Sequence, residues 1–151
     1  MTASGATIAM IGHPNVGKSA LFQRLTGARV IVSNYPGTTV EVSKAAVRTQ
    51  PELTLLDTPG IITLPASSED EAVTERVLLE EPLQAVLQVG DAKNLRRTLL
   101  LTLQLAETGL PVVLALNMLD EARSRGLQVD TAHLARELGL PVIPTVAVRG
   151  Q

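Results

Sequence analysis

The sequence contains no cysteine and almost no aromatic side chains. Its 151 residues include one tyrosine, one phenylalanine and no tryptophan. Because cysteine is absent, disulfides, zinc–thiolate sites and thiol nucleophiles are excluded, and the chain suits a reducing compartment. A core must therefore be built from aliphatic side chains. The 45% hydrophobic content is enough for the core of a single domain over residues 1–151.

Excess charge of one sign and long apolar runs are lacking as well. The formal net charge is −2, so the chain has no cationic surplus for nucleic acid, and we expect no nucleic-acid partner. The longest apolar run, Leu99–Leu105, is interrupted by Thr102 and Gln104 and is too short to cross a bilayer. The N-terminus has no basic secretory signal. We expect the chain as given to be soluble.

Short apolar segments alternate with segments of helical character along the chain. This alternation predicts an α/β domain with a mostly parallel central sheet and helices on both faces. Strands are predicted at Thr7–Ile11, Val40–Arg48, Glu52–Leu56, Gln84–Val89, Pro111–Leu116 and Val142–Val146. Helices are predicted from Gly17 to near Gly27, from Ser68 towards Glu80, over Leu95–Thr108, and from Asp130 or Thr131 to Gly139.

Two connections and the end of the sequence refine this prediction. Only Thr49-Gln50-Pro51 separates the second and third strands, which is too short for a parallel crossover, so the pair is a hairpin with one antiparallel strand. Ala28–Thr39 combines Ser, Asn, Pro and Gly and is predicted to be a loop. No helix is predicted after the last strand, so the C-terminal helix of such a fold is expected to be missing.

Residues 12–19, GHPNVGKS, carry the strongest motif. They match G-x-x-x-x-G-K-[ST] between a strand and a helix, which is the context that a phosphate-binding loop requires. Glycines bring backbone N–H groups to phosphates, the lysine adds a cation, the serine hydroxyl faces Mg²⁺, and the helix N-terminus favours the anion. The expected binding residues are Gly12, His13, Pro14, Asn15, Val16, Gly17, Lys18, Ser19 and Ala20.

Three features near these motifs receive a structural interpretation from the residues alone. His13 is expected to be an exposed loop residue, and two histidines in the chain cannot form a metal cluster. Asn15 is expected to stabilise the turn through a side-chain hydrogen bond. The acidic run Ser67–Glu75 is expected to be a solvated helix start, which the helix dipole favours.

Two further motifs each follow a predicted strand. Asp57 can hold Mg²⁺, usually through water, and Gly60 can bring its backbone N–H to a γ-phosphate. In Asn117-Met118-Leu119-Asp120, a buried Asp120 can accept hydrogen bonds from guanine N1–H and the exocyclic amine. Adenine presents no matching pair, so the unpaired carboxylate discriminates against it. Asn117 is expected to tie the surrounding loops together.

In this order, the three motifs resemble the G domain of translation-factor-related GTPases. The sequence between them is similar to the cytosolic G domain of the FeoB family, the bacterial ferrous iron transport proteins B. The similar segments include SNYPGTTVE, LLEEPLQAVLQVGDAKNL and PVIPT. The N-M-x-D form and the segment Asp91-Ala92-x-Asn94-Leu95 are typical of that family. The resemblance covers about Ile8–Thr145. Two departures are DTPG in place of the usual DLPG, and Val146 where a serine is common.

The resemblance implies further site residues. Arg29–Thr39 would be switch I and Gly60 to about Glu75 switch II. The switch I residues implied to bind nucleotide are Tyr35, Pro36, Gly37, Thr38 and Thr39. Tyr35 either shields the nucleotide or packs on the surface. The resemblance also implies a nucleotide-binding loop at Pro144-Thr145-Val146-Ala147, the last of five in this family. Val146 and Ala147 would contact the nucleotide, and the Ala147 N–H would donate to the guanine carbonyl.

The resemblance also implies metal ligands and a catalytic mode. Ser19, Thr39 and Asp57 would hold Mg²⁺, and Asn15 with switch I carbonyls would hold K⁺ beside the phosphates. The implied catalytic residues are Asn15, Lys18, Thr39 and Gly60. Ile61 stands where many GTPases carry a glutamine that orients water. Hydrolysis is therefore expected to be slow and K⁺-stimulated.

The resemblance implies that the chain has a P-loop GTPase fold and is an N-terminal fragment of a larger membrane protein. The fragment would lie on the cytoplasmic side of the bacterial inner membrane. It would hydrolyse GTP to GDP and phosphate as a switch that regulates ferrous iron import. The implied partners are GTP and GDP, a helical spacer and a transmembrane domain, with a homo-oligomer left open. Two alternatives are a guanine-nucleotide sensor with negligible turnover and a K⁺-dependent GTPase associated with ribosomes or tRNA.

Overall fold

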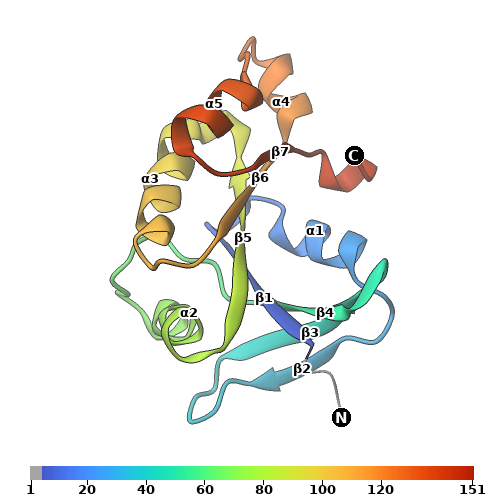
Figure 1. The fold of residues 1–151 in the computed structure, drawn as a ribbon, viewed down its shortest axis with the longest axis vertical. Helices are drawn as coiled ribbons and strands as arrows, with labels where there is room; N and C mark the ends of the chain where they lie inside the picture. Colours follow the sequence, from blue (N-terminus) through green and yellow to red (C-terminus); the bar gives the residue numbers. More distant parts are fainter. Residues whose placement is uncertain (1–4) are drawn as a thin grey trace.

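A central seven-stranded sheet organises the fold in a computed structural model, which describes residues 5–151 (Figure 1). The strand order is β2-β3-β4-β1-β5-β6-β7. The strands are β1 (Ala6–Gly12), β2 (Ile31–Asn34), β3 (Glu41–Val47), β4 (Gln50–Asp57), β5 (Leu83–Asp91), β6 (Val112–Asn117) and β7 (Val142–Pro144). From β4 through β1, β5 and β6 to β7 all neighbours pair in parallel, which confirms the predicted α/β class.

The other end of the sheet is antiparallel. β3 and β4 form the predicted hairpin, with Ser43 opposite Asp57. The prediction of a continuous loop over Ala28–Thr39 was wrong in part, because β2 pairs antiparallel with β3 at the edge of the sheet. The β-branched residues of Val30-Ile31-Val32 favour a strand there despite the turn-forming residues around them.

Helices cover both faces of the sheet, as predicted (Figure 1). They are α1 (Lys18–Leu25), α2 (Glu69–Glu80), α3 (Leu95–Ala106), α4 (Leu119–Ser124) and α5 (Thr131–Leu138), with 3₁₀ turns η1 (Ala92–Asn94) and η2 (Ala147–Arg149). The short helix α4 was not predicted, and the last strand ends at Pro144 rather than Val146. α1 ends before Gly27 because Thr26 has an extended backbone conformation (φ −106°, ψ 164°), and the Thr26 N–H and hydroxyl both donate to the Phe22 carbonyl.

The core lies on both sides of β1, whose side chains alternate between the two faces. Ala9 and Ile11 pack among apolar residues of α2 and α3, whereas Met10 packs with Phe22 of α1. All three β1 side chains are fully buried. This central position fixes the end of β1, and with it the loop of residues 12–19, against the strands on either side.

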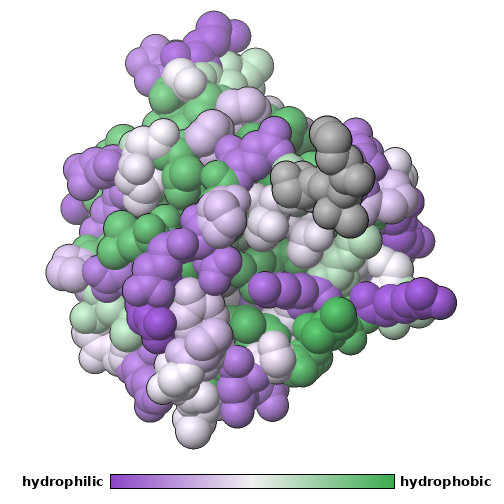
Figure 2. All heavy atoms as spheres, turned by 60° about the horizontal axis from the view of Figure 1, so that its bottom comes forward, coloured by the Kyte–Doolittle hydropathy of each residue, from purple (hydrophilic) through white to green (hydrophobic). Residues whose placement is uncertain are grey.

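The surface mixes polar and apolar side chains. Figure 2 shows apolar atoms interspersed with polar ones over the lower end of the molecule. Apolar exposure includes the edge strand β2, where Ile31 is 69% exposed. Within residues 5–151, no helix is both long and apolar enough to span a membrane.

Candidate nucleotide-binding site

The glycine-rich loop joins β1 to α1 at the carboxyl end of the parallel strands, where ligands bind in open α/β sheets. A Cβ at Gly12 would lie 2.7 Å from the Val89 carbonyl oxygen, so only glycine fits this close approach of β1 to β5. Gly17 caps α1 at φ 88°, a conformation that favours glycine, and a Cβ there would lie 2.2 Å from the Asn117 amide nitrogen. The loop is therefore shaped by its glycines, as the motif predicts.

Lys18 and Asp57 face the same hollow. The Lys18 ammonium donates hydrogen bonds to the Asp57 carboxylate and to the Thr58 carbonyl oxygen. The hollow measures about 500 Å³. Its lining residues are Lys18, Ser19, Thr39, Val40, Glu41, Ser43, Asp57, Thr58, Pro59, Gly60, Glu69 and Asp70. The structure thus brings the three predicted Mg²⁺ ligands to one cavity.

The donor set of this hollow fits a hard cation. Ser19 and Thr39 offer hydroxyl oxygens and Asp57 a carboxylate, and Mg²⁺ is commonly held by one or two carboxylates together with phosphate oxygens and water. Over residues 5–151, no three His, Cys, Asp or Glu side chains are grouped so that they could hold a metal ion. These residues therefore suit a Mg²⁺ ion that a phosphate ligand helps to coordinate.

A second hollow, of about 350 Å³, lies over the loop itself. It is lined by His13, Pro14, Asn15, Gly17, Lys18, Ser19, Ala20 and Gly60. Asn15 has φ 65°, a left-handed conformation that asparagine tolerates better than most residues, and its side chain is exposed. Gly60 approaches Pro14 closely, and the Ile61 N–H donates to the Gly12 carbonyl at 2.9 Å. These contacts join the segment after Asp57 to the glycine-rich loop.

His13 does not lie exposed in the loop, and the prediction that it would was wrong. Its side chain is 4% exposed. Nδ1 lies 2.7 Å from the Ile61 carbonyl oxygen and Nε2 lies 3.2 Å from the Arg97 carbonyl oxygen. A ring nitrogen that carries a proton can donate to the carbonyl beside it. His13 therefore links the glycine-rich loop to the segment after β4 and to α3.

Tyr35 also lies away from the hollows around Lys18. The prediction left open whether Tyr35 covers a nucleotide or packs on the surface, but its side chain is buried in the core cluster of α2 and α3. Its hydroxyl donates to Glu81 at 3.2 Å and its ring stacks under the Arg76 guanidinium. Pro36-Gly37-Thr38 form a turn closed by the Thr38 N–H and the Tyr35 carbonyl, which leaves Thr39 exposed at the cavity.

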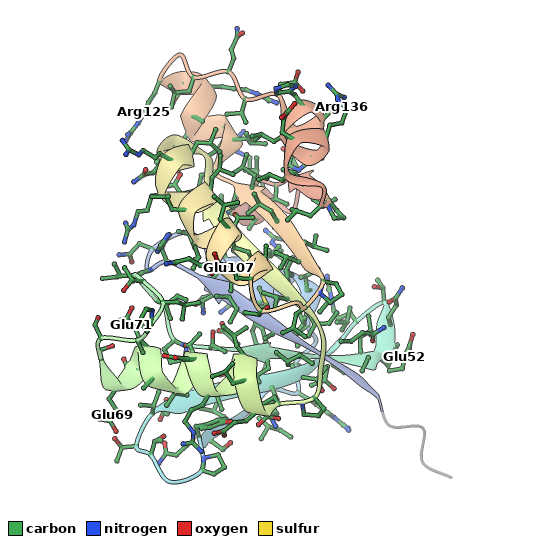
Figure 3. All side chains as sticks on the ribbon, turned by 60° about the vertical axis from the view of Figure 1, so that its left-hand side comes forward. Glu52, Glu69, Glu71, Glu107, Arg125 and Arg136 are labelled. Carbon is green, nitrogen blue, oxygen red and sulfur yellow. The ribbon has the colours of Figure 1, made fainter. Side chains whose placement is uncertain are left out.

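The prediction of a solvated acidic helix start holds for the exposed Glu69 and Asp70 but was wrong for Glu71. Ser68 caps α2 as predicted, accepting a hydrogen bond from the Glu71 N–H at 3.1 Å. The Glu71 side chain is only 5% exposed, however, and accepts hydrogen bonds from the backbone N–H groups of Ile62 and Thr63 and from the hydroxyls of Ser67 and Ser68. Figure 3 shows Glu71 and Glu69 on different sides of α2.

These donors stabilise the charged form of Glu71. Hydrogen bonds from the Ser67 hydroxyl and then from the Ile62 and Thr63 N–H groups lower the pKa of Glu71 from 4.5 to about 2. A carboxyl group with a depressed pKa contributes stability that is fully present above its unfolded pKa and is lost as the pH falls through the folded one. Glu71 thus stabilises the loop after Gly60 at neutral pH and loses this effect between about pH 4.5 and 2.

The substitution Glu71→Gln is expected to lower the melting temperature at pH 7, because an amide cannot accept all four hydrogen bonds. The difference from the unsubstituted chain should shrink as the pH falls from 4.5 towards 2, which melting curves across that range would measure. Glu69→Gln removes the same charge from an exposed position in the same turn and serves as the control. A Glu71→Gln deficit that stays constant across the range would contradict this assignment.

Asn117 joins the loops on the base side, as predicted. Its side chain is 3% exposed. Nδ2 donates to the Val16 carbonyl oxygen at 3.0 Å, while Oδ1 accepts from the Thr145 hydroxyl at 3.1 Å and from the Ala147 N–H at 3.0 Å. One amide thereby connects the phosphate loop, the end of β6 and the segment after β7.

Two details of the base side differ from the prediction. The Ala147 N–H, which was assigned to the guanine carbonyl, donates to Asn117 instead. Asp120 is half-buried rather than buried, with a side chain 25% exposed and 3.5 Å from the Arg149 guanidinium. The side chain of Val146, which departs from the serine common in the family, is buried among residues of α4 and β7.

The DTPG sequence, the other departure from the family pattern, is also accommodated by the fold. The hydroxyl of its Thr58 donates to the Met10 carbonyl at 2.8 Å.

A mostly parallel sheet with a phosphate loop at the end of β1, an aspartate at the end of β4 and an Asn-x-x-Asp turn that begins at the end of β6 defines the G-domain class of P-loop proteins. The family model of ferrous iron transport protein B matches residues 6–151. The chain belongs to this family, FeoB, and the resemblance drawn from its sequence is confirmed.

The relatives of the chain are longer proteins. Over 150 residues the chain is 42% identical to the Fe(2+) transporter FeoB of Salmonella typhimurium and equally to that of Shigella flexneri. Each match covers 96% of this chain and 19% of the relative. The chain therefore spans about one fifth of the length of these curated relatives.

Solved FeoB structures share the fold. A mutant of S. thermophilus NFeoB bound to mGDP has a TM-score of 0.93 at 41% identity, covering 97% of this chain and 56% of that chain. The G domain of the T. maritima FeoB iron transporter has a TM-score of 0.87 at 36% identity, covering 97% of this chain and 90% of that chain.

Proposed function

We propose that this chain is a G domain that binds GTP, hydrolyses it to GDP and phosphate, and acts as a switch that regulates ferrous iron import by a longer FeoB protein. The observation that carries the proposal is the convergence of Lys18, Asp57 and Thr39 on one cavity. Asn117 ties the neighbouring turn with Asp120 to the same phosphate loop. Two of the S. thermophilus NFeoB mutants were crystallised with GDP or mGDP, which supports a guanine nucleotide as the ligand.

Phosphate binding would rearrange the contacts of Lys18. Its ammonium, which contacts the Asp57 carboxylate and the Thr58 carbonyl, would turn to the phosphate oxygens. Asp57 would then hold Mg²⁺ together with Ser19 and Thr39, and the ion would neutralise phosphate charge. Because Thr39 lies in the turn after β2, its engagement would couple switch I to the γ-phosphate, and phosphate release would free it.

Asn15 is proposed to hold K⁺ in the second hollow. It lies exposed beside Gly60 and Lys18. Carbonyl groups of Ser33–Pro36 do not line this hollow, so switch I would have to move towards it on nucleotide binding for them to complete the site. A monovalent cation there would stabilise charge that develops in the transition state, as an arginine side chain does in other GTPases.

The substitution Asn15→Gly tests this role without straining the loop. Glycine accepts the left-handed conformation of this position and removes only the side chain. In phosphate-release assays, the unsubstituted chain should hydrolyse GTP roughly tenfold or more faster in KCl than in NaCl, the size of effect given by one charge-stabilising group. Asn15→Gly should reduce KCl activity to the NaCl level. Equal rates in both salts for the unsubstituted chain would contradict the K⁺ site.

A sensor with negligible turnover is the second candidate, and Ile61 favours it. Its side chain is fully buried, and its N–H and C=O groups bond to Gly12 and His13. It therefore offers no side chain to orient an attacking water. Nucleotide binding without phosphate release in either salt would support the sensor over the GTPase.

The remaining proposals concern the longer protein. We propose that residues 1–151 form one domain on the cytoplasmic side of the bacterial inner membrane, joined to a helical spacer and a transmembrane domain. Size measurements of the full-length protein would test for a homo-oligomer. No nucleic acid is proposed as a partner, in line with the net charge of −2.

A further inference from the structure

Lys93 lies beside the turn assigned to base recognition, at the unspecified position of the segment Asp91-Ala92-x-Asn94-Leu95. β5 and β6 pair in parallel with Asp91 opposite Asn117, so η1 follows β5 next to the Asn117–Asp120 turn. The Lys93 ammonium lies 2.7 Å from the Glu121 carboxylate and 3.5 Å from that of Asp91. The Lys93 side chain is 16% exposed and that of Glu121 is 53% exposed, so solvent partly screens their contact.

The same ammonium reaches the side chain of Met118. Lys93 Nζ lies 3.3 Å from Met118 Sδ, and Met118 Cε lies 3.7 Å from the position that a Cβ would take on Gly17. The Met118 side chain therefore extends from Lys93 towards the phosphate loop. Met118 also has φ 62°, a left-handed conformation that is unfavourable for most residues other than glycine. Surrounding contacts must hold the turn in this shape.

Helix α4 has little local support of its own. It contains six residues, and its N-cap residue Met118 makes no side-chain cap hydrogen bond. Asp120 and Glu121 occupy its first turn. The contact of Lys93 with Glu121 therefore holds the turn that carries Asp120 from outside the site. Hydrogen bonding to Glu121 raises the pKa of Lys93, so the ammonium stays charged.

We infer that Lys93 is a positioning residue for base selection, which holds the first turn of α4 through Glu121 and Met118 so that Asp120 faces the exocyclic amine of a guanine base. This inference rests on the proposed function. Lys93 acts on Asp120 through its neighbours and is not itself assigned a contact with the nucleotide. Removing it should weaken selection for guanine more than it weakens phosphate binding.

The test compares GDP with inosine diphosphate, whose base lacks the exocyclic amine. The dissociation constant for inosine diphosphate divided by that for GDP measures how strongly Asp120 binds that amine. Lys93→Met, which keeps an unbranched apolar side chain but removes the ammonium group, should lower this ratio roughly fivefold, within the range of measured couplings between contacting residues. Lys93→Arg should restore most of the ratio. Lys44→Met is the matched control, because Lys44 is exposed on β3.

Each outcome decides the inference. An unchanged ratio in Lys93→Met, whether or not its melting temperature falls, would mean that Lys93 supports only the fold. If Lys93→Met does not fold, Glu121→Ala removes the same contact from a side chain that is 53% exposed, and it should lower the ratio in the same direction. A preserved ratio there would overturn the inference. If the unsubstituted chain binds neither diphosphate, the proposed function fails instead.

Discussion

Replacing Asp120 by asparagine is expected to weaken GDP binding by about 100-fold and to create binding of xanthosine diphosphate. The carboxylate accepts hydrogen bonds from guanine N1–H and the exocyclic amine, whereas an asparagine NH₂ group would face those donors. Xanthine carries a carbonyl in place of the amine and accepts from that NH₂. Because the Asp120 side chain is 25% exposed, water compensates part of the loss, and the effect stays below that of a fully buried group.

Calorimetric titration with both diphosphates measures this exchange. Asp130→Asn is the matched control, since it makes the same change at an exposed N-cap position of α5, where asparagine caps equally well. The control should bind GDP as the unsubstituted chain does. Undiminished GDP affinity in Asp120→Asn, without any gain of xanthosine diphosphate binding, would show that another residue reads the base.

Replacing Asn117 by alanine is expected to destabilise the domain by about 3 kcal/mol, because buried groups lose their partners. The Val16 carbonyl and the Ala147 N–H would both be left without the Asn117 amide, and the link to Thr145 would be lost. Nucleotide affinity should fall as well, since the same amide connects the base-side turn to the phosphate loop.

Urea unfolding with and without GDP separates the two effects of Asn117→Ala. The free energy of unfolding without nucleotide reports the lost hydrogen bonds, and the increase on adding GDP reports affinity. Asn34→Ala is the control, since Asn34 is exposed on the edge strand β2 and its loss should stay within about 0.5 kcal/mol. A similar small loss for Asn117→Ala would show that water replaces its hydrogen bonds.

The motifs of the site were predictable because their chemistry is local. The glycines of residues 12–19 have conformations and close approaches that other residues cannot adopt, so their spacing alone indicates the loop. Asp57 and Asn117 follow apolar strands, and parallel strands place such positions at one edge of the sheet. The hairpin of β3 and β4 followed from the length of its connection.

Side-chain orientations were not predictable because partners distant in the sequence determine them. His13 bonds to carbonyls 48 and 84 residues away, and the Tyr35 hydroxyl bonds to Glu81 from 46 residues away. The short elements β2 and α4 depend on tertiary contacts in the same way, β2 on pairing with β3 and α4 on packing beside β6 and β7. Glu71 carried a cap signature, but its buried hydrogen bonds to the loop after Gly60 had no local signal.

Calorimetric titration of the unsubstituted chain with GDP and with ADP, each in the presence of Mg²⁺, tests the central claim most directly. Phosphates are identical in the two ligands, so any difference in affinity comes from the base. The convergence of Lys18, Asp57 and the Asn117–Asp120 turn predicts that GDP binds at least about 100-fold more tightly than ADP. Equal affinities, or no heat with GDP, would contradict a guanine-nucleotide site.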